Sequence, residues 1–434
     1  MADTTLWSTW LSGGARSRIA LYELGEDRAV SGSFLTEKAS AWAERLSACG
    51  KGKMVVLAGK NSAHWLVRFL AIQKSGSTAI LVDDGCGFEA VRQAAQRFGA
   101  DAIFHEEDLE ILKKARSRTA RHCVYKVTSG SLGIPKLIPC SAQHLLADGR
   151  NILQGMGIRP GDRQLGLIPL GHSYGLGNLV MPLLMQGTPV WTAKEWTISQ
   201  IPDWISLHRL TVFPSVPSVL EMISRHPCKK LARSLRLVIS AGAPLPKEVA
   251  GTFFHRYRKR IRNFYGSSET GGICYDNTGK AGIRGDSVGE PLPGVRVSFS
   301  PTKRIRVTSL AVANASRTWL LGDCGERLPS GEVRIFGRIG RIAEIGGKKV
   351  KPQEIQRELG AVHGIQKSFV DVFERGGRNC LVAWYVGSRG VEEVRLALRK
   401  RIAAWKVPRM IIRRKSIPNT SRGKVDIKQL RRSL

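Results

Sequence analysis

The chain has 434 residues, of which 42% are hydrophobic and 24% are charged. These proportions exclude a disordered polypeptide and indicate a folded protein, and the length indicates more than one domain. Its 68 lysines and arginines outnumber its 35 acidic residues, so the formal net charge is +33 and polyanions are candidate partners.

Eight cysteines are spread along the chain and none forms a CxxC pair, so the sequence offers no metal cluster or redox dithiol. Isolated cysteines are typical of a reducing compartment, and we expect a cytoplasmic protein without a signal peptide. Residues 164–193 carry no formal charge, but five glycines, three prolines and His172 interrupt them. We therefore expect a buried core with an internal cleft there, and no transmembrane helix.

Strand and helix patterns alternate in the first part of the chain. Apolar periodicity predicts helices at 35–49 and 63–74 and strands at 54–58 and 78–82. The same rhythm recurs between residues 210 and 260. Such βαβ alternation predicts mostly parallel sheets covered by helices.

Beyond Gly282 the pattern changes to short strands with turns, and a compact segment of helices and strands follows. The expected strands are 295–299, 304–307, 332–336 and 381–386, and the expected helices are 352–359 and 391–403. The sequence thus predicts an α/β protein. Residues 1–337 would form a large amino-terminal domain of mostly parallel βαβ sheets with a small β-rich subdomain, and residues 338–434 a mobile small α+β domain.

The strongest local signal is the segment T-S-G-S-L-G-I-P-K at 128–136, between an apolar stretch and a helix expected to begin near Ala142. Small hydroxyl and glycine residues let backbone N–H groups close around a polyphosphate, and Lys136 adds a mobile positive charge. The segment is not the common GxxxxGK[ST] loop. A serine- and glycine-rich surface turn remains the alternative. The candidate phosphate-binding residues are Thr128, Ser129, Gly130, Ser131, Gly133 and Lys136.

This loop resembles the TSGSTGxPK loop of the adenylate-forming superfamily, which includes acyl- and aryl-CoA synthetases, luciferases and the adenylation domains of peptide synthetases. It departs from that loop only by Leu132. Further blocks resemble the family's motifs in the family's order. They lie at 169–173, 240–245, 265–269, 322–323, 337–355 and 418–426.

The resemblance implies an enzyme that binds ATP and Mg²⁺. A flat tyrosine suits adenine stacking, and a carboxylate is the hard ligand that Mg²⁺ prefers. In this implied site Glu269 binds the metal, Ser268 donates to the α-phosphate, and Asp323 with Arg338 binds the ribose. The implied adenine-side residues are Gly242, Ala243, Pro244, Tyr265 and Gly266.

The resemblance also implies that Lys424 is the catalytic lysine, with Glu269 and His172 as the other members of the catalytic set. A positioned ammonium stabilises the negative charge that develops when a carboxylate attacks the α-phosphate. In a tail this basic, a solvated surface lysine is the alternative, and the P-N-T-S-R-G-K-V-D string decides against it. His172 is assigned to the lining of the acid pocket rather than to proton transfer.

In the peptide-synthetase domains that this chain resembles, an aspartate in the pocket block holds the α-ammonium of an amino acid. The corresponding segment at 170–173 has no carboxylate, so the resemblance implies an aryl or fatty acid without an α-amino group. The candidate pocket residues are His172, Tyr174, Gly175, Phe213 and Val216. Gly347 would let a pantetheine arm pass. The sequence departs from the family at the hinge, where Gly340 and Arg341 replace the usual acidic residues, and at Glu344, where lysine is common.

Three functions remain open at this stage. The first is transfer of the acyl group to coenzyme A. The second is a stand-alone ligase that loads an acidic acyl carrier protein, which complementary charge would attract. The third is a basic nucleic-acid-associated protein with a vestigial adenylation fold, which no nucleic-acid-binding motif supports.

Overall fold

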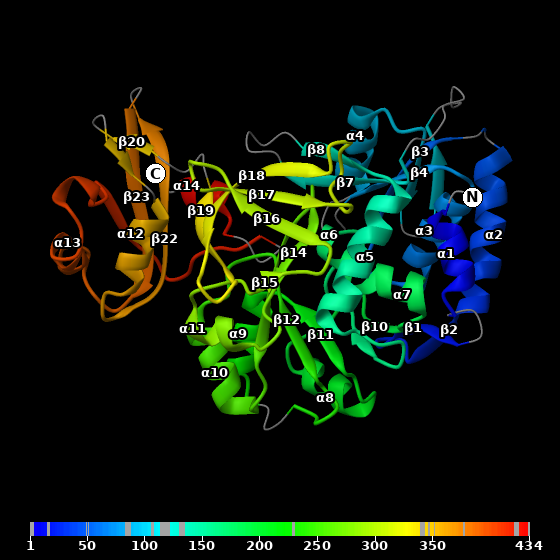
Figure 1. The fold of residues 1–434 in the computed structure, drawn as a ribbon, viewed down its shortest axis with the longest axis horizontal. Helices are drawn as coiled ribbons and strands as arrows, with labels where there is room; N and C mark the ends of the chain where they lie inside the picture. Colours follow the sequence, from blue (N-terminus) through cyan, green and yellow to red (C-terminus); the bar gives the residue numbers. More distant parts are fainter. Residues whose placement is uncertain are drawn as a thin grey trace. The chain divides into compact units, whose positions relative to one another are not determined.

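The structure is a computed structural model, and it divides into two compact units (Figure 1). The first comprises Met1–Val297, Val307–Trp319 and Leu328–Val333, and the second Ser298–Arg306, Leu320–Arg327 and Arg334–Leu434. The two units are considered separately. The residues that the structure describes are 4–14, 18–48, 50, 52–82, 88–105, 108–112, 122–129, 135–227, 231–338, 343–345, 348–350, 352–375, 378–420 and 425–432.

A six-stranded sheet in the first unit has the order β6-β5-β3-β4-β7-β8. Its inner strands are short apolar runs that pair in parallel, as expected for strands buried on both faces. Antiparallel partners close each edge. The strands are β3 (Met54–Ala58), β4 (Thr78–Leu81), β5 (Ala102–His105), β6 (Asp108–Ile111), β7 (Val124–Ser129) and β8 (Pro135–Cys140).

A nine-stranded sheet has the order β15-β14-β13-β12-β11-β9-β10-β1-β2. Its consecutive strands β1, β10, β9, β11, β12 and β13 are parallel, so their carboxyl ends meet at one edge. The strands are β1 (Ile19–Glu23), β2 (Arg28–Ser31), β9 (Gln164–Leu165), β10 (Val190–Thr192), β11 (Val212–Ser215), β12 (Leu237–Ser240), β13 (Ile261–Ser267), β14 (Gly271–Tyr275) and β15 (Glu290–Pro291).

Helices cover both faces of the two sheets. Side chains that alternate along each strand enter different apolar clusters, so Val56 packs towards α4 while Val55 and Leu57 enter the central core. The helices of this unit are α1 (Leu6–Ser12), α2 (Gly32–Ala48), α3 (Ala63–Lys74), α4 (Phe88–Phe98), α5 (Ala142–Met156), α6 (Ser173–Gly175), the π-helix η1 (Leu176–Val180), α7 (Met181–Gln186), α8 (Gln200–Leu207), α9 (Pro217–Arg225), α10 (Lys247–Tyr257) and α11 (Lys280–Arg284).

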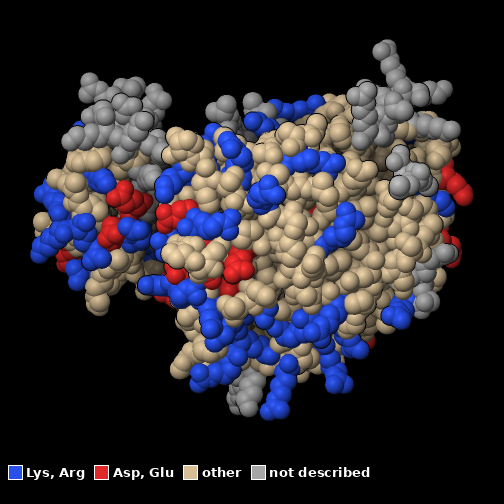
Figure 2. Space-filling view, in the orientation of Figure 1, with Lys and Arg blue, Asp and Glu red and all other residues tan. Residues whose placement is uncertain are grey.

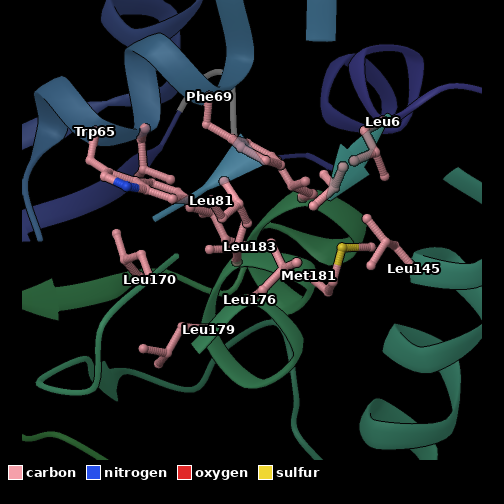
Figure 3. Packing of buried hydrophobic residues seen from close by; sticks show 14 of the residues in the cluster. Leu6, Trp65, Phe69, Leu81, Leu145, Leu170, Leu176, Leu179, Met181 and Leu183 are labelled. Atoms are coloured by element: carbon pink, nitrogen blue, oxygen red, sulfur yellow. The ribbon is translucent and has the colours of Figure 1, made fainter. Parts of the chain in front are cut away.

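The central core brings together side chains from distant parts of the sequence (Figure 3). Leu6 of α1, Phe69 of α3, Leu145 of α5 and Met181 of α7 converge there. Trp65 stacks on Phe69 with ring centroids 5.3 Å apart. Burial of one such side chain stabilises the fold by about 1.5–3 kcal/mol, so this core joins the two sheets into one unit.

A four-stranded sheet has the order β16-β17-β18-β19. Its strands are β16 (Val295–Phe299), β17 (Arg304–Ser309), β18 (Thr318–Arg327) and β19 (Val333–Arg338). The carboxyl-terminal part of the second unit has its own apolar clusters around Ile355 and Trp384. Its elements are β20 (Ala343–Ile345), β21 (Lys348–Val350), α12 (Pro352–Gly360), β22 (Ile365–Arg375), β23 (Arg378–Gly387), α13 (Val391–Arg399), the 3₁₀-helix η2 (Ala404–Lys406), β24 (Met410–Arg413) and α14 (Ile427–Arg431).

The predicted α/β class with mostly parallel sheets is confirmed, whereas the boundary between residues 337 and 338 stays a prediction. The helix expected near Ala142 begins at that residue, and β8, a strand that the sequence did not predict, starts within the candidate phosphate loop and precedes the helix. Pro135 and Pro139 argue against a strand in the sequence, because proline has no N–H to donate to a neighbouring strand. Both are tolerated because β8 is an edge strand. Among the described helices, none is both long and apolar enough to cross a membrane.

Replacement of Gly271 by alanine should destabilise the first unit by about 3 kcal/mol, because Gly271 has φ +71° and a Cβ there would lie 2.3 Å from Asp148 Oδ1. Gly157→Ala is the matched control, since Gly157 has φ +63° and nothing within 4 Å of the added Cβ. The control should cost only about 1 kcal/mol. Urea denaturation measures both, and equal losses would contradict the packing argument.

Candidate active site

The candidate phosphate loop connects the two strands of a hairpin. Thr128 on β7 pairs with Lys136 on β8, and Ser129 pairs with Pro135. Thr128 is half-buried, whereas Lys136 is exposed beside the connection. The hairpin therefore holds the two ends of the loop together with a lysine at its mouth. Gly130, Ser131 and Gly133 lie outside the described residues, and only the backbone of Ser129 is described.

A second candidate segment follows the carboxyl end of β12. Ala241 N donates to Ser215 O over 3.2 Å, which ties this turn to β11. Gly242 is exposed at φ +86°, a conformation that glycine adopts without strain. The hydroxyl of Ser240 is buried and has no hydrogen-bond partner among the described residues. The turn, which continues into exposed Pro244, thus offers a polar group and an open backbone.

The Tyr265–Glu269 segment ends β13 at a bulge in its pairing with β14. A Cβ at Gly266 would lie 2.8 Å from Gly271 O, so the close approach of the strands requires glycine. The carbonyl of Glu269 accepts a hydrogen bond of 2.9 Å from Ala313 N. The Glu269 side chain is half-buried and forms no ion pair within the described part of the chain. Its backbone is therefore fixed while its carboxylate is available to a ligand.

One hydrogen bond brings two predicted segments together. Ser173 Oγ donates to Ser268 Oγ over 2.8 Å, which joins the 169–173 segment to the 265–269 segment. His172 caps α6, where its Nδ1 accepts from Tyr174 N over 3.3 Å, so its imidazole ring is held in one orientation. A Cβ at Gly175 would lie 2.0 Å from Pro169 O, and Gly175 is therefore required by packing.

The structure separates two of the predicted pocket residues. Tyr174 belongs to the central core, where its ring lies 5.8 Å from Phe264 and its hydroxyl donates to Ile239 O over 3.4 Å. Phe213 packs into the other cluster, among α8, α9 and α10. Neighbouring residues of a strand point to opposite faces, so Val212 and Phe213 enter different clusters, and Tyr174 packs in the cluster of Val212. The structure therefore does not bring these two side chains together, and their assignment to the acid pocket stays a prediction. Val216 lies beside the Gly242 turn.

Asp148 is a further residue of this region that the sequence did not single out. It is fully buried on α5, and its Oδ1 accepts from Gly272 N over 2.8 Å. Gly177 and Gly271 also border the carboxylate, where a Cβ would lie within 3.3 Å and 2.3 Å of its oxygens. Burial raises the pKa of Asp148, while the charge of Lys126 on β7 and the Gly272 N–H oppose that rise. Asp148 therefore links the end of the Glu269 turn to α5 and, through charge, to the strand of the phosphate loop.

The described residues hold no cluster of three or more histidine, cysteine, aspartate or glutamate side chains that could bind a metal. A single half-buried carboxylate at Glu269 nevertheless fits Mg²⁺ that arrives with a nucleotide, since this ion keeps several waters and bridges carboxylate to phosphate.

The remaining predicted residues belong to the second unit. Asp323 is buried on β18, and of Arg338 only the backbone is described. Lys424 lies outside the described residues, but the flanking segments are fixed. Asn419 forms a bridge with Val425, and Asp426 N donates to Pro418 O over 2.8 Å.

Comparison with known proteins identifies the family. A model of the AMP-binding enzyme family matches residues 12–127 and 121–299. The chain therefore belongs to the AMP-binding enzyme family, and the resemblance stated from the motifs is confirmed. Among curated relatives, feruloyl-CoA synthase of an Amycolatopsis species is 25% identical and covers 93% of this chain and 94% of its own length. Benzoate–CoA ligase of Thauera aromatica is 26% identical over 74% of this chain and 68% of its own length.

Solved structures share the fold. O-succinylbenzoate coenzyme A synthetase from Bacillus subtilis, in complex with ATP and magnesium ion, aligns with a TM-score of 0.83 at 19% identity and covers 99% of both chains. ATP-bound MatB from Rhodopseudomonas palustris aligns with a TM-score of 0.84 at 20% identity, over 99% of this chain and 98% of its own.

The stability of the Asp148→Asn variant relative to the native protein should rise with pH above about 4. Asp148 has a raised pKa in the folded state, so its protonated form stabilises the fold at low pH and that contribution is lost as pH rises through the folded pKa. Asparagine keeps the acceptor for Gly272 N without the charge. Urea denaturation across a pH series measures the difference.

Asp162→Asn should give the opposite sign. Burial acts to raise the pKa of Asp162, but hydrogen bonds from Arg236, Arg159 N and Thr211 outweigh it and lower that pKa. Its carboxylate therefore contributes stability above the unfolded pKa that is lost as pH falls. The asparagine variant should lose stability relative to the native protein as pH rises. The same trend in both variants would contradict the two assignments.

Proposed function

We propose that the chain activates an aryl carboxylic acid with ATP and transfers the acyl group to coenzyme A. In the first half-reaction a carboxylate oxygen attacks the α-phosphorus, and the bond to the departing pyrophosphate breaks. In the second, the thiol loses its proton, its sulfur attacks the acyl carbon, and AMP departs. The products are acyl-CoA, AMP and pyrophosphate.

The hydrogen bond between Ser173 and Ser268 carries this proposal. It brings the segment assigned to the acid within one side-chain contact of the turn assigned to the α-phosphate and the metal. Reacting groups held in one geometry react faster because the entropy of bringing them together is already lost. An acid bound beside His172 would thus lie next to the phosphate that Ser268 contacts.

Local structure also supports the nucleotide assignment. The exposed turn at Gly242 suits the approach of a polar base, and the buried Ser240 hydroxyl, which has no partner among the described residues, ends the strand that carries this turn. The hairpin pairing of Thr128 with Lys136 sets a cation at the mouth of the phosphate loop. Mg²⁺, when bound, would neutralise phosphate charge. We assign Glu269 to the metal. Lys424, Asp323 and Arg338 complete the proposed set of catalytic and nucleotide-binding residues.

An aryl acid is favoured over a fatty or amino acid. Several relatives carry the names of aryl acids, among them feruloyl-CoA synthase, benzoate–CoA ligase and indoleacetate–CoA ligase. The segment at 170–173 offers no carboxylate for an α-ammonium group. The named relatives also favour coenzyme A over a carrier protein as acceptor, and we place the enzyme in the cytoplasm.

A pyrophosphate-exchange screen over aryl, fatty and amino acids tests the acid class. Aryl acids should drive exchange of labelled pyrophosphate into ATP, because adenylation is reversible while the adenylate stays bound. Exchange with amino acids alone would contradict the assignment. Coenzyme A and a purified acyl carrier protein are then each added to the enzyme that holds the acyl-adenylate. Formation of the acylated carrier rather than acyl-CoA would contradict the assignment of coenzyme A as acceptor.

Lys424→Ala should lower pyrophosphate exchange by a factor of about 10²–10³, because a charge that stabilises the transition state is lost. Thioester formation from preformed acyl-adenylate should be largely unchanged, since that step requires no attack on phosphorus. Lys428→Ala, an exposed neighbour on α14, is the control and should alter neither step. Equal loss of both half-reactions would contradict the role of Lys424.

Glu269→Gln should raise the Mg²⁺ concentration needed for half-maximal exchange by about tenfold, since one charged oxygen ligand becomes neutral at nearly constant size. Saturating Mg²⁺ should restore most of the rate. Glu248→Gln on α10 removes an exposed carboxylate and should leave the requirement unchanged. An unaltered Mg²⁺ dependence in Glu269→Gln would show that the carboxylate does not serve the metal.

A further inference from the structure

Positive charge gathers where the parallel strands of the nine-stranded sheet begin, at the end of these strands opposite to the candidate site. The helices α8, α9 and α10 each connect parallel strands, so they run back across the sheet and end where the next strand begins. This edge carries basic residues within the three positions that precede β9, β11 and β13. We name the amino-end patch by Arg163, Arg209, Arg258, Lys259 and Arg260. Figure 2 shows Lys and Arg gathered on the face where Figure 1 shows α8 and α10.

The charge of this patch is not neutralised locally. Arg163 Nη1 donates to His208 O over 2.9 Å, and Lys259 Nζ donates to Leu235 O over 2.5 Å, so these bonds go to carbonyl groups rather than carboxylates. None of the five residues forms an ion pair with an acidic side chain in the described parts of the chain. The neighbouring Asp162 is already bound by Arg236.

Two arginines of the patch occupy backbone positions that favour glycine. Arg258 ends α10 at φ 54°, and Arg209 follows α8 at φ 51°. Helices commonly end at a glycine in this left-handed conformation, and any other residue adopts it at a cost in stability. Both side chains are exposed, so packing does not account for them. These two helix ends therefore carry an arginine where the backbone conformation favours glycine.

Apolar side chains accompany the charge. Leu207, the last residue of α8, is 75% exposed, and Met222 on α9 is 47% exposed. Trp204 lies one helical turn before Leu207 and is half-buried. Exposed apolar residues beside arginines fit a bilayer surface, where the charges meet anionic headgroups and the apolar groups enter the acyl boundary. A nucleic acid would gain nothing from the exposed leucine.

The geometry points to peripheral binding of anionic lipid bilayers through the amino-end patch. A partner that receives the acyl group would dock near the carboxyl ends of the strands, where Ser240 and Gly242 lie, so an acyl carrier protein does not account for charge at the other edge. This inference does not depend on the proposed reaction.

Sedimentation with vesicles of phosphatidylcholine, with and without phosphatidylglycerol, tests the inference on the full chain. The native protein should bind the anionic vesicles and not the neutral ones, and salt should weaken binding because it screens the headgroup potential. The Arg209→Gly/Arg258→Gly variant should bind about 25-fold more weakly, at about fivefold per charge. Its thermal midpoint should not fall, because glycine relieves both backbone positions.

Lys303→Gly/Arg317→Gly is the matched control. It removes two positive charges from left-handed positions at φ 63° and 54°. Arg317 lies near His144 at the start of α5, away from the amino-end patch. Its vesicle binding should equal that of the native protein. Leu207→Ser should weaken binding without loss of stability, since this side chain is 75% exposed.

Three results would overturn the inference. Equal binding to neutral and anionic vesicles would exclude headgroup recognition. Equal weakening of vesicle binding in the two double-glycine variants would show that binding depends on net charge and not on the patch. Patch-dependent binding of a duplex oligonucleotide, with no sedimentation on vesicles, would assign the patch to nucleic acid. Each of these experiments reads binding and stability alone, so loss of adenylation activity would leave the outcome unaffected.

Discussion

The parallel pairing of β1, β10, β9, β11, β12 and β13 is the constraint on which the rest of the first unit depends. Parallel strands require crossover connections, and the helices that supply them cover the sheet from both sides. Every carboxyl end therefore lies at one edge and every amino end at the other. The turns after β11 and β12 meet at the first edge, as the bond from Ala241 to Ser215 shows.

The same polarity gives the two edges different electrostatic character. Helices that follow a parallel strand start at the carboxyl edge, where their free N–H groups favour anions, and end at the amino edge, where free carbonyl groups favour cations. Arg163 binds such a carbonyl group at His208, after α8, and Arg236 binds the carbonyl of Gly157, which ends α5. Basic residues at this edge thus have a structural role. This role does not explain Arg209 and Arg258, which occupy backbone positions that favour glycine.

Strand and helix identity could be predicted wherever the information was local. The strand at Met54–Ala58 and the helix at Ala63–Lys74 have the predicted bounds, because a short apolar run and an amphipathic repeat define them. The two-residue strand β9 has no such signal, since its pairing with β10 and β11 defines it. The order of the motif blocks gave the family correctly, whereas the geometry of Lys424 stays a prediction from sequence.

Side-chain direction could not be predicted from the sequence, and Phe213 and Asp148 show why. An apolar residue on a strand buried on both faces can enter either core, so Phe213 could not be separated from a pocket residue without its neighbours. Asp148 did leave a trace, because it interrupts the apolar stripe of Leu145, Ile152 and Met156 on α5. A carboxylate on such a stripe must find buried donors, and it finds one in Gly272 N, at the end of the turn that carries Glu269. The fully buried carboxyl group and the proposed metal ligand are therefore parts of one connected structure, in which the glycines around Asp148 set how closely that turn approaches α5.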